Sequence, residues 1–373
     1  MSWRYIASRL NGDGTETFLD WELPLADVAV TNRLSGPDAL GASIAPEVAT
    51  LKVGGSPLIQ PWSTAIYAEA EGQIRAGAIV TDITVEGPRL DIDCLGFPGY
   101  ALDMPYTGEY SRVDIDPLDV VRDIWDHIQM SRGGNIGLQV DDLKTGLKIG
   151  TPERDVEFET GTGEPVSFVA GPVKLMWYQT HNLGREIDKL AKDTPFDYRE
   201  SHAWNGETID HRLRLGYPTI GRRRHDLRFV VGENIHLIPS VDFGEDYASE
   251  VLALGAGEGR KMIRSTNARP DGRLRRVAVV PNKSLTSTTQ ANRFARQEVA
   301  RRLGLADVTE VTILDHPHAP LGSFDVGDEI FIQVGSGWAE DVALWCRVIS
   351  VSIAPESLGV ARLSILRTDR ITA

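Results

Sequence analysis

The chain has 373 residues, of which 42% are hydrophobic and 25% are charged, and its formal net charge is −14. This length exceeds one ordinary hydrophobic core and predicts two or three domains. The acidic balance argues against a dedicated nucleic-acid-binding protein. The sequence also lacks a run of about 18 apolar residues, the length that a membrane-spanning helix needs. The opening residues lack a secretion signal, so we expect synthesis in a cytoplasm.

The charge is uneven along the chain. Residues 1–198 carry 16 Lys and Arg against 31 Asp and Glu, residues 199–302 carry 19 against 12, and residues 303–373 carry 4 against 10. The basic middle favours contact with an acidic partner or a neighbouring copy, or a solvated face. Nucleic-acid or lipid contact is the alternative, but no stacking aromatics are interleaved with the cations. These cations are Arg222, Arg223, Arg224, His225, Arg260, Lys261, Arg264, Arg269, Arg273, Arg275 and Arg276.

The first 112 residues are expected to form a β module. In residues 89–95, Leu90, Ile92 and Cys94 alternate with charged residues, which predicts one face in a core and one in water. The sequence Asn-Gly-Asp-Gly at 11–14 favours a hairpin turn, because these residues tolerate a positive φ. Several short strands separated by turns predict a barrel or sandwich. The expected strands are Trp3–Leu10, Phe18–Leu23, Val28–Leu34, Ala65–Ala70, Gln73–Val85 and Arg89–Leu95.

Helices and hairpins are predicted to follow in the middle of the chain. Asp116 is a suitable N-cap, Pro117 suits the first helical position, and Gly133-Gly134 is expected to end this helix. A second helix is expected near Thr180–Lys192, and Asn205-Gly206 predicts a hairpin between Phe196–Ala203 and Glu207–Leu215. A further pair of strands is expected within Leu227–Ile238.

The C-terminal part is expected to form a second β module with one helix near Thr289–Leu303. Its predicted strands are Val308–Leu314, Asp328–Val334, Leu344–Ile353 and Val360–Arg367. The expected fold class is therefore β-rich α+β. We predict three domains: an N-terminal β module at 1–112, a helix-containing middle region at 113–240, and a C-terminal β module at 241–373.

No motif predicts a catalytic, cofactor-binding or metal site, and no cofactor is expected. The glycines of Gly255–Gly259 match no phosphate-binding pattern, and Asn11–Glu16 lacks a full calcium-ligand set. His316-Pro317-His318 offers two imidazoles where zinc needs three or four ligands. Asp126 and His127 are adjacent on a predicted helix and point in different directions, which argues against an acid/base pair. Cys94 and Cys346 are expected to be buried thiols rather than a disulfide or metal pair.

Several segments resemble minor tail proteins of actinobacterial long-tailed (siphovirus) bacteriophages. The resemblance covers most of the chain and is densest over residues 1–150. None of these segments carries chemistry, because they are turn, cap and core signatures. They are Asn11–Glu16 with Leu23–Leu25, Leu34–Pro37 with Ala45–Glu47, Gly55–Thr64, Asp116–Arg122 with Ile124–Gln129, Asn135–Leu138, Val326–Ile330 and Arg347–Val351.

This resemblance implies a structural, non-enzymatic tail-tip protein similar to baseplate hubs. Such hubs contain two tail-tube-like β modules per chain and form homotrimers, so that six similar modules match the hexameric tube. The implied partners are the distal tail or tail tube protein, the tape measure protein and other minor tail proteins. Phage DNA would pass through the ring transiently and without specific binding, and the implied location is the virion tail tip.

Two other functions stay open from the sequence. One is a tail-associated cell-wall hydrolase, which would need paired acids or a metal in a pocket. The other is a receptor- or sugar-binding tail module with exposed aromatic side chains. Trp204, beside the predicted hairpin turn, and Trp338, in a Gly-rich segment, are the candidates for such a platform.

Overall fold

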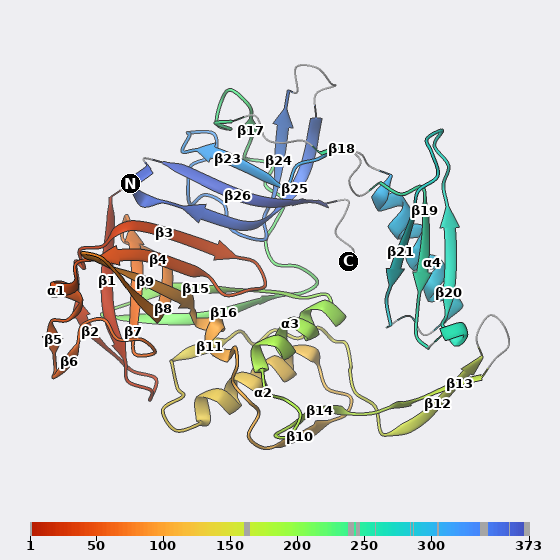
Figure 1. Ribbon diagram of the computed structural model, residues 1–373, viewed down its shortest axis with the longest axis horizontal. Helices are drawn as coiled ribbons and strands as arrows, with labels where there is room; N and C mark the ends of the chain where they lie inside the picture. Colours follow the sequence, from red (N-terminus) through yellow and green to blue (C-terminus); the bar gives the residue numbers. More distant parts are fainter. Residues whose placement is uncertain are drawn as a thin grey trace.

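The computed structural model describes residues 2–159, 165–237, 242–243, 247–257, 259–283, 285, 287–303, 306–335, 342–357 and 359–368. The chain is rich in strands, as the sequence predicts, and a single sheet of twelve strands runs through most of it (Figure 1). Ten strands lie in the order β17-β24-β25-β3-β4-β9-β8-β7-β1-β2; β26 also pairs with β25, and β23 pairs with β26. No described helix is long and apolar enough to span a membrane.

The N-terminal half of this sheet is antiparallel, in the order β3-β4-β9-β8-β7-β1-β2, and has a core of its own. Ile66 and Leu40 are buried in this core, whereas Tyr67 and Ile6 are buried in the core that the sheet shares with the middle region. Short β5 (Lys52–Val53), β6 (Ser56–Pro57) and α1 (Pro46–Ala49) form a side loop. Its strands are β1 (Trp3–Leu10), β2 (Glu16–Asp20), β3 (Ala26–Arg33), β4 (Ala39–Ile44), β7 (Thr64–Ala70), β8 (Gln73–Glu86) and β9 (Arg89–Gly96).

The C-terminal module continues the same sheet. Its core contains Phe229, Ile330 and Leu363, each buried. Its strands are β17 (Phe229–Val230), β23 (Glu310–Leu314), β24 (Glu329–Val334), β25 (Val342–Ile353) and β26 (Val360–Arg367). Four of the five strands match predicted ones, whereas the predicted strand pair within Leu227–Ile238 reduces to the two-residue β17 in the part that is described.

The two β modules are joined edge to edge by β3 and β25. These strands run antiparallel with Arg33 opposite Ser350 and Val30 opposite Ile353. The hydroxyl oxygens of Thr31 and Ser352 lie 2.9 Å apart across the junction. Segments more than 300 residues apart in sequence therefore belong to one continuous sheet.

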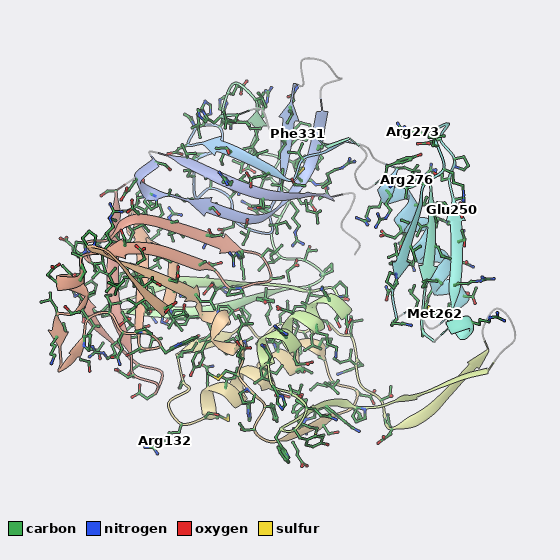
Figure 2. All side chains as sticks on the ribbon, in the orientation of Figure 1. Arg132, Glu250, Met262, Arg273, Arg276 and Phe331 are labelled. Carbon is green, nitrogen blue, oxygen red and sulfur yellow. The ribbon has the colours of Figure 1, made fainter. Side chains whose placement is uncertain are left out.

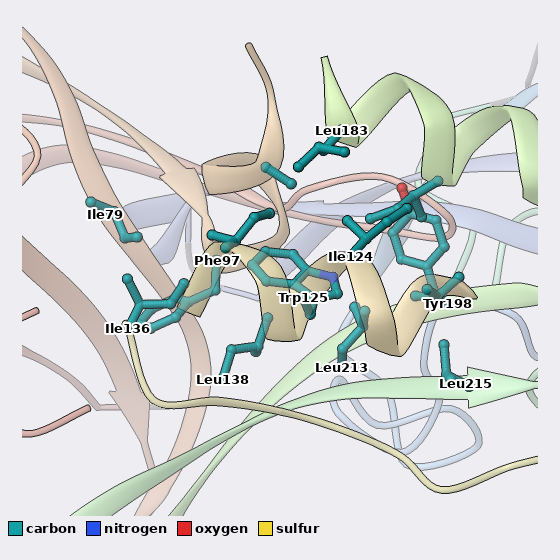
Figure 3. Close-up of a cluster of buried hydrophobic side chains, with 14 of the residues drawn as sticks. Ile79, Phe97, Ile124, Trp125, Ile136, Leu138, Leu183, Tyr198, Leu213 and Leu215 are labelled. Carbon is teal, nitrogen blue, oxygen red and sulfur yellow. The ribbon is translucent and has the colours of Figure 1, made fainter. Parts of the chain in front are cut away.

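The middle region covers one face of the N-terminal sheet with two helices. Asp116 caps α2 (Pro117–Met130), because its Oδ1 accepts from the Leu118 N–H at 3.0 Å. Trp125 of α2 is fully buried in the core shown in Figure 3, together with residues from β15 and β16. The other elements are η1 (Phe97–Ala101), β10 (Glu109–Arg112), β11 (Leu138–Val140), β12 (Arg154–Glu159), β13 (Pro165–Ala170), β14 (Val173–Met176), α3 (Leu183–Asp193), β15 (Asp197–Asn205) and β16 (Thr208–Gly216).

Residues 247–302, called here the lobe, form a separate small unit at one side of the molecule (Figure 1). Helix α4 (Thr288–Arg302) packs on one face of a three-stranded sheet of order β20-β19-β21. Their shared core includes Val251, Ala291 and Val299. The strands are β19 (Glu250–Leu254), β20 (Arg264–Ala268) and β21 (Val277–Pro281); η2 (Gly259–Lys261) lies between two of them, and β18 (Asp242–Phe243), β22 (Ala306–Asp307) and η3 (Pro355–Ser357) complete the chain.

The hydrophobic cores divide the chain differently from the predicted domains 1–112, 113–240 and 241–373. Leu227, Phe229 and Ile235 pack into the C-terminal core although they precede residue 241. The helix predicted for the C-terminal module instead belongs to the core of the lobe. The reason is that β17 pairs with β24, while the apolar stripe of α4 is already covered by β19 and β20.

Candidate functional site

The turn at Asn11–Glu16 is the hairpin expected from the sequence. Gly12 and Gly14 have φ of 74° and 90°, and Asp13 Oδ1 accepts hydrogen bonds from the backbone and hydroxyl of Thr15 at 2.9 and 2.6 Å. Those hydrogen bonds lower the pKa of Asp13 below its ordinary value. Within the described part of the chain, no group of three His, Cys, Asp or Glu has the geometry to hold a metal ion.

The two histidines at 316 and 318 lie in a loop between strands. Their ring centroids are 4.8 Å apart, and the Glu233 carboxylate is 4.0 Å from His318. Cys94 and Cys346 are both buried and reduced, as predicted. Gly255 directly follows β19 (Glu250–Leu254), and an added Cβ there would meet the Leu285 carbonyl, so this glycine allows close packing.

The helix residues Trp125, Asp126 and His127 have separate environments, as the sequence predicts. Trp125 is in the core, Asp126 is exposed, and His127 stacks on Tyr106 with ring centroids 3.9 Å apart. His127 Nε2 also lies 3.1 Å from the Thr107 N–H. Asp126 and His127 are therefore not an acid/base pair.

Part of the basic middle is neutralised within the chain. The buried Arg224 guanidinium contacts Asp226 at 2.7 Å and Asp328 at 3.3 Å. Arg223 pairs with Glu329 at 2.6 Å and lies over the ring of Trp345. These two arginines hold β17 and its flanks on the C-terminal module, so their role is structural. In the lobe, by contrast, several arginines project into solvent.

A buried chain of polar side chains, which no sequence motif predicts, connects the N-terminal module to the β15–β16 hairpin. His211 Nε2 contacts Glu16 Oε1 from β2, and its Nδ1 lies 2.9 Å from His202 Nδ1. His202 Nε2 lies 3.2 Å from Glu200 Oε2. The two Glu200 oxygens accept from the backbone N–H groups of Asp38 and Phe97, each at 2.8 Å. We call these four side chains the polar chain.

Burial sets the protonation of the polar chain. Desolvation lowers the pKa of His202 to about 4 and also lowers that of His211, which Glu16 partly opposes. Desolvation raises the pKa of Glu200 to about 8, although the two backbone donors oppose it. For Glu16 burial would raise the pKa, but hydrogen bonds from three neighbouring side chains and attraction to His211 lower it. Near pH 7, Glu16 is ionised and His202 is neutral.

The polar atoms of Glu16, His211, His202 and Glu200 all have hydrogen-bond partners inside the protein. Each histidine contacts the other through Nδ1 and a glutamate through Nε2. Both Glu200 oxygens accept hydrogen bonds from backbone N–H groups. Glu16 additionally accepts from Ser8 at 2.6 Å and Tyr67 at 2.8 Å. An acid/base catalyst needs an atom within hydrogen-bond reach of a substrate proton, and here those atoms are already used. The arrangement suits a clamp between two parts of the fold.

An aromatic cluster, formed by Phe18, Trp21 and Trp204, lies next to the polar chain. The ring centroids of Phe18 and Trp21 are 4.5 Å apart, and Trp204 lies about 6 Å from both. Trp21 is 46% exposed. A cavity of about 260 Å³ adjoins the cluster through Phe18, and its polar lining includes Glu16 and His211 of the polar chain together with Gln139 and Asp210. The other candidate from the sequence, Trp338, lies outside the described residues.

Comparison with solved structures finds the same fold over nearly the whole chain. The prophage MuSo2 43 kDa tail protein from Shewanella oneidensis superposes with a TM-score of 0.59 at 12% identity, covering 98% of each chain. The prophage tail protein gp18 from Listeria monocytogenes gives 0.53 at 11%, covering 99% of this chain and 95% of that one. The tail protein from Neisseria meningitidis gives 0.53 at 13%, covering 98% and 97%.

These similarities assign the chain to a fold class. It has the fold of phage tail proteins. No protein-family model and no curated protein matches the sequence. At identities of 11–13% the comparison establishes architecture and not function, so the role of the chain is argued below from its geometry.

Proposed function

We propose that the chain is a structural hub protein at the tail tip of a long-tailed bacteriophage. On this proposal it forms a homotrimeric ring between the hexameric tail tube and the three-fold tip, and it is not an enzyme. Its partners would be the distal tail or tail tube protein, the tape measure protein and other minor tail proteins. The proposal includes an origin in a long-tailed phage of actinobacteria, which the sequence resemblance suggests.

The observation that carries this proposal is the β3–β25 junction. Two β modules with separate cores stand side by side in one chain and share a continuous sheet. Three such chains present six modules, the number needed to face a six-fold ring, while keeping three-fold symmetry below. The tail-protein fold of the chain supports the same assignment.

The charge of the chain suits passage of DNA without binding. Residues 1–198 and 303–373 carry net charges of −15 and −6. A channel lined by these parts would repel the phosphate backbone. Arg223 and Arg224 are already paired within the chain, which leaves them unsuited as DNA contacts. A ring whose channel is lined mainly by Arg222–Arg224 would contradict this part of the proposal.

Location and activity can be tested on purified tails. Gold-labelled antibodies against the chain are expected to mark only the tail tip, and labelling along the tube would contradict the proposal. A zymogram on host cell walls is expected to show no clearing, because the polar chain offers no free acid or base. Clearing that is lost in Glu16→Gln would instead establish the hydrolase.

The aromatic cluster beside the polar cavity favours one second candidate, a sugar-binding role at the tail tip. Exposed aromatic faces next to hydrogen-bonding side chains are a common way to bind a small ligand. The variant Trp204→Ala distinguishes the two roles. Unchanged phage adsorption with normal tail assembly would exclude sugar binding at this cluster, whereas lost adsorption with normal assembly would establish it.

A further inference from the structure

The lobe leaves one face of its sheet uncovered. Alternate residues of β19, Val251 and Ala253, are fully buried under α4. The residues between them point to the opposite face, where Leu252 lies opposite Val279 and Thr266, and Leu254 lies opposite Arg264. Val277 and Val279 are 41% and 57% exposed. A sheet with one face on a helix and an apolar opposite face is expected to bury that second face elsewhere.

Arginines lie on and beside this apolar face, which also carries the carboxylate of Glu250 opposite Val277. Arg264 lies on the face itself and is exposed, and Arg276 adjoins the start of β21 near Arg273 and Glu250 (Figure 2). Among the described residues, neither Arg264 nor Arg276 forms an ion pair through its side chain, whereas Arg275 pairs with Glu250 at 2.6 Å. Leu274, in the same loop, is 88% exposed.

The charge of the lobe is opposite to that of the rest of the chain. Residues 247–302 hold 12 Lys and Arg against 4 Asp and Glu, whereas residues 1–198 hold 16 against 31. A surface with an apolar centre and a cationic rim is complementary to an acidic protein surface. Nucleic acid is a poorer occupant, because an apolar centre offers no contact to phosphates and the described strand residues of this face include no aromatic side chain.

We propose that the outer face of the lobe sheet, formed by Leu252, Leu254, Arg264, Val277 and Val279, binds the acidic part of a second copy of this chain. This inference rests on the proposed function, because it names the contact by which one copy holds the next in the ring. The contact is heterologous: the lobe of one copy meets residues 1–198 of its neighbour, so successive copies turn in one direction and close a ring.

Self-association of the full-length chain tests the proposal. Sedimentation velocity over a concentration series is expected to show concentration-dependent association that weakens in high salt. Val279→Asp and, separately, Arg264→Glu are expected to weaken association at least tenfold. Leu237→Asp, which changes a side chain 60% exposed and outside both the lobe and residues 1–198, is the matched control and is expected to associate as the wild type does. Circular dichroism shows that each variant is folded.

Cross-linking identifies the partner surface. A photoreactive residue at position 279, in a mixture of isotopically light and heavy chains, is expected to give light–heavy cross-links to residues within 1–198. Cross-links confined to another region, or a wild-type chain that stays monomeric at every concentration, would overturn the proposal. So would a DNA mobility shift that Val279→Asp abolishes. If Val279→Asp associates normally, the lobe contact is wrong while the trimeric ring stands, since that ring is tested separately in the tail.

Discussion

The Nδ1 atoms of His202 and His211 lie 2.9 Å apart inside the contact between the β15–β16 hairpin and the N-terminal module. One nitrogen must donate and the other accept, so only one of the two Nδ1 atoms carries a proton. This contact constrains the tautomers of both rings. The outer ring nitrogens contact Glu16 on the His211 side and Glu200 on the His202 side. Protonation of either histidine is therefore expected to change the stability of the contact between the β15–β16 hairpin and the N-terminal module.

The first prediction concerns pH. His202 has a pKa of about 4 in the folded chain but near 6.5 when unfolded. Between these values the unfolded chain binds more protons, so the contribution of His202 to stability is present above about pH 6.5 and is lost as pH falls toward 4. His202→Asn is expected to destabilise the protein at pH 7, and this loss should shrink by a few kcal/mol toward pH 4.

Urea unfolding of wild type and His202→Asn at a series of pH values measures this difference. Comparing the two proteins at each pH separates His202 from Glu200, whose raised pKa acts in the opposite direction and lowers stability as pH rises from about 4.5 to about 8. A difference between the two proteins that does not change with pH would show that His202 does not titrate as proposed.

The second prediction concerns the anchoring role of Glu200. Replacing it by Ala removes the acceptor for the backbone N–H groups of Asp38 and Phe97. Two buried donors without partners are expected to cost about 2–5 kcal/mol of unfolding free energy. Glu207→Ala, in the exposed turn of the same hairpin, should stay within about 0.5 kcal/mol of wild type. Equal unfolding free energies for Glu200→Ala and Glu207→Ala would show that the Glu200 hydrogen bonds do not stabilise the fold.

The third prediction concerns the junction of the β modules. Leu34 follows β3 in the N-terminal module, yet its side chain packs against the C-terminal core and its N–H donates to Ile349 at 2.9 Å. Leu34→Ala is expected to lower the unfolding free energy by about 1–2 kcal/mol. Leu51→Ala, at a side chain 55% exposed, is the control and should change little. Faster proteolytic release of the C-terminal module from Leu34→Ala alone would confirm the junction.

The fourth prediction concerns Arg224. Its guanidinium is buried and satisfies both Asp226 and Asp328. Arg224→Met would leave Asp328 buried without its cation, at an expected cost of about 3 kcal/mol in thermal or chemical unfolding. Arg222→Met removes an exposed side chain of the same length and should be nearly neutral. A neutral Arg224→Met would mean that this arginine is available to an external partner after all.

Local pattern predicted much of the fold. The strand at Val360–Arg367 has the predicted bounds, because its alternation is regular, and α2 and α4 begin within one residue of prediction, since Asp116 and Ser287 are good caps. Strand β4 was missed because Gly41 and Ser43 interrupt its apolar pattern. The lobe was missed because its strands are short and lie between Arg-rich segments.

Long-range relationships could not be predicted from local pattern. The pairing of β3 with β25 depends on contacts more than 300 residues apart. The polar chain did leave a signal, because Glu200 and His202 occupy alternate positions with buried Tyr198, and His211 lies between buried Ile209 and Leu213. Polar residues on the apolar face of a strand indicate a buried network, although their partner Glu16 is identified only by the fold.

The measurement that tests the central claim most directly is an averaged electron cryo-microscopy image of the intact tail. The account predicts a three-fold density next to the last tube ring, in which six β modules, two from each chain, surround an open or plugged channel. A single copy at the tip, a density away from the channel, or a ring in which each chain contributes one module would contradict it.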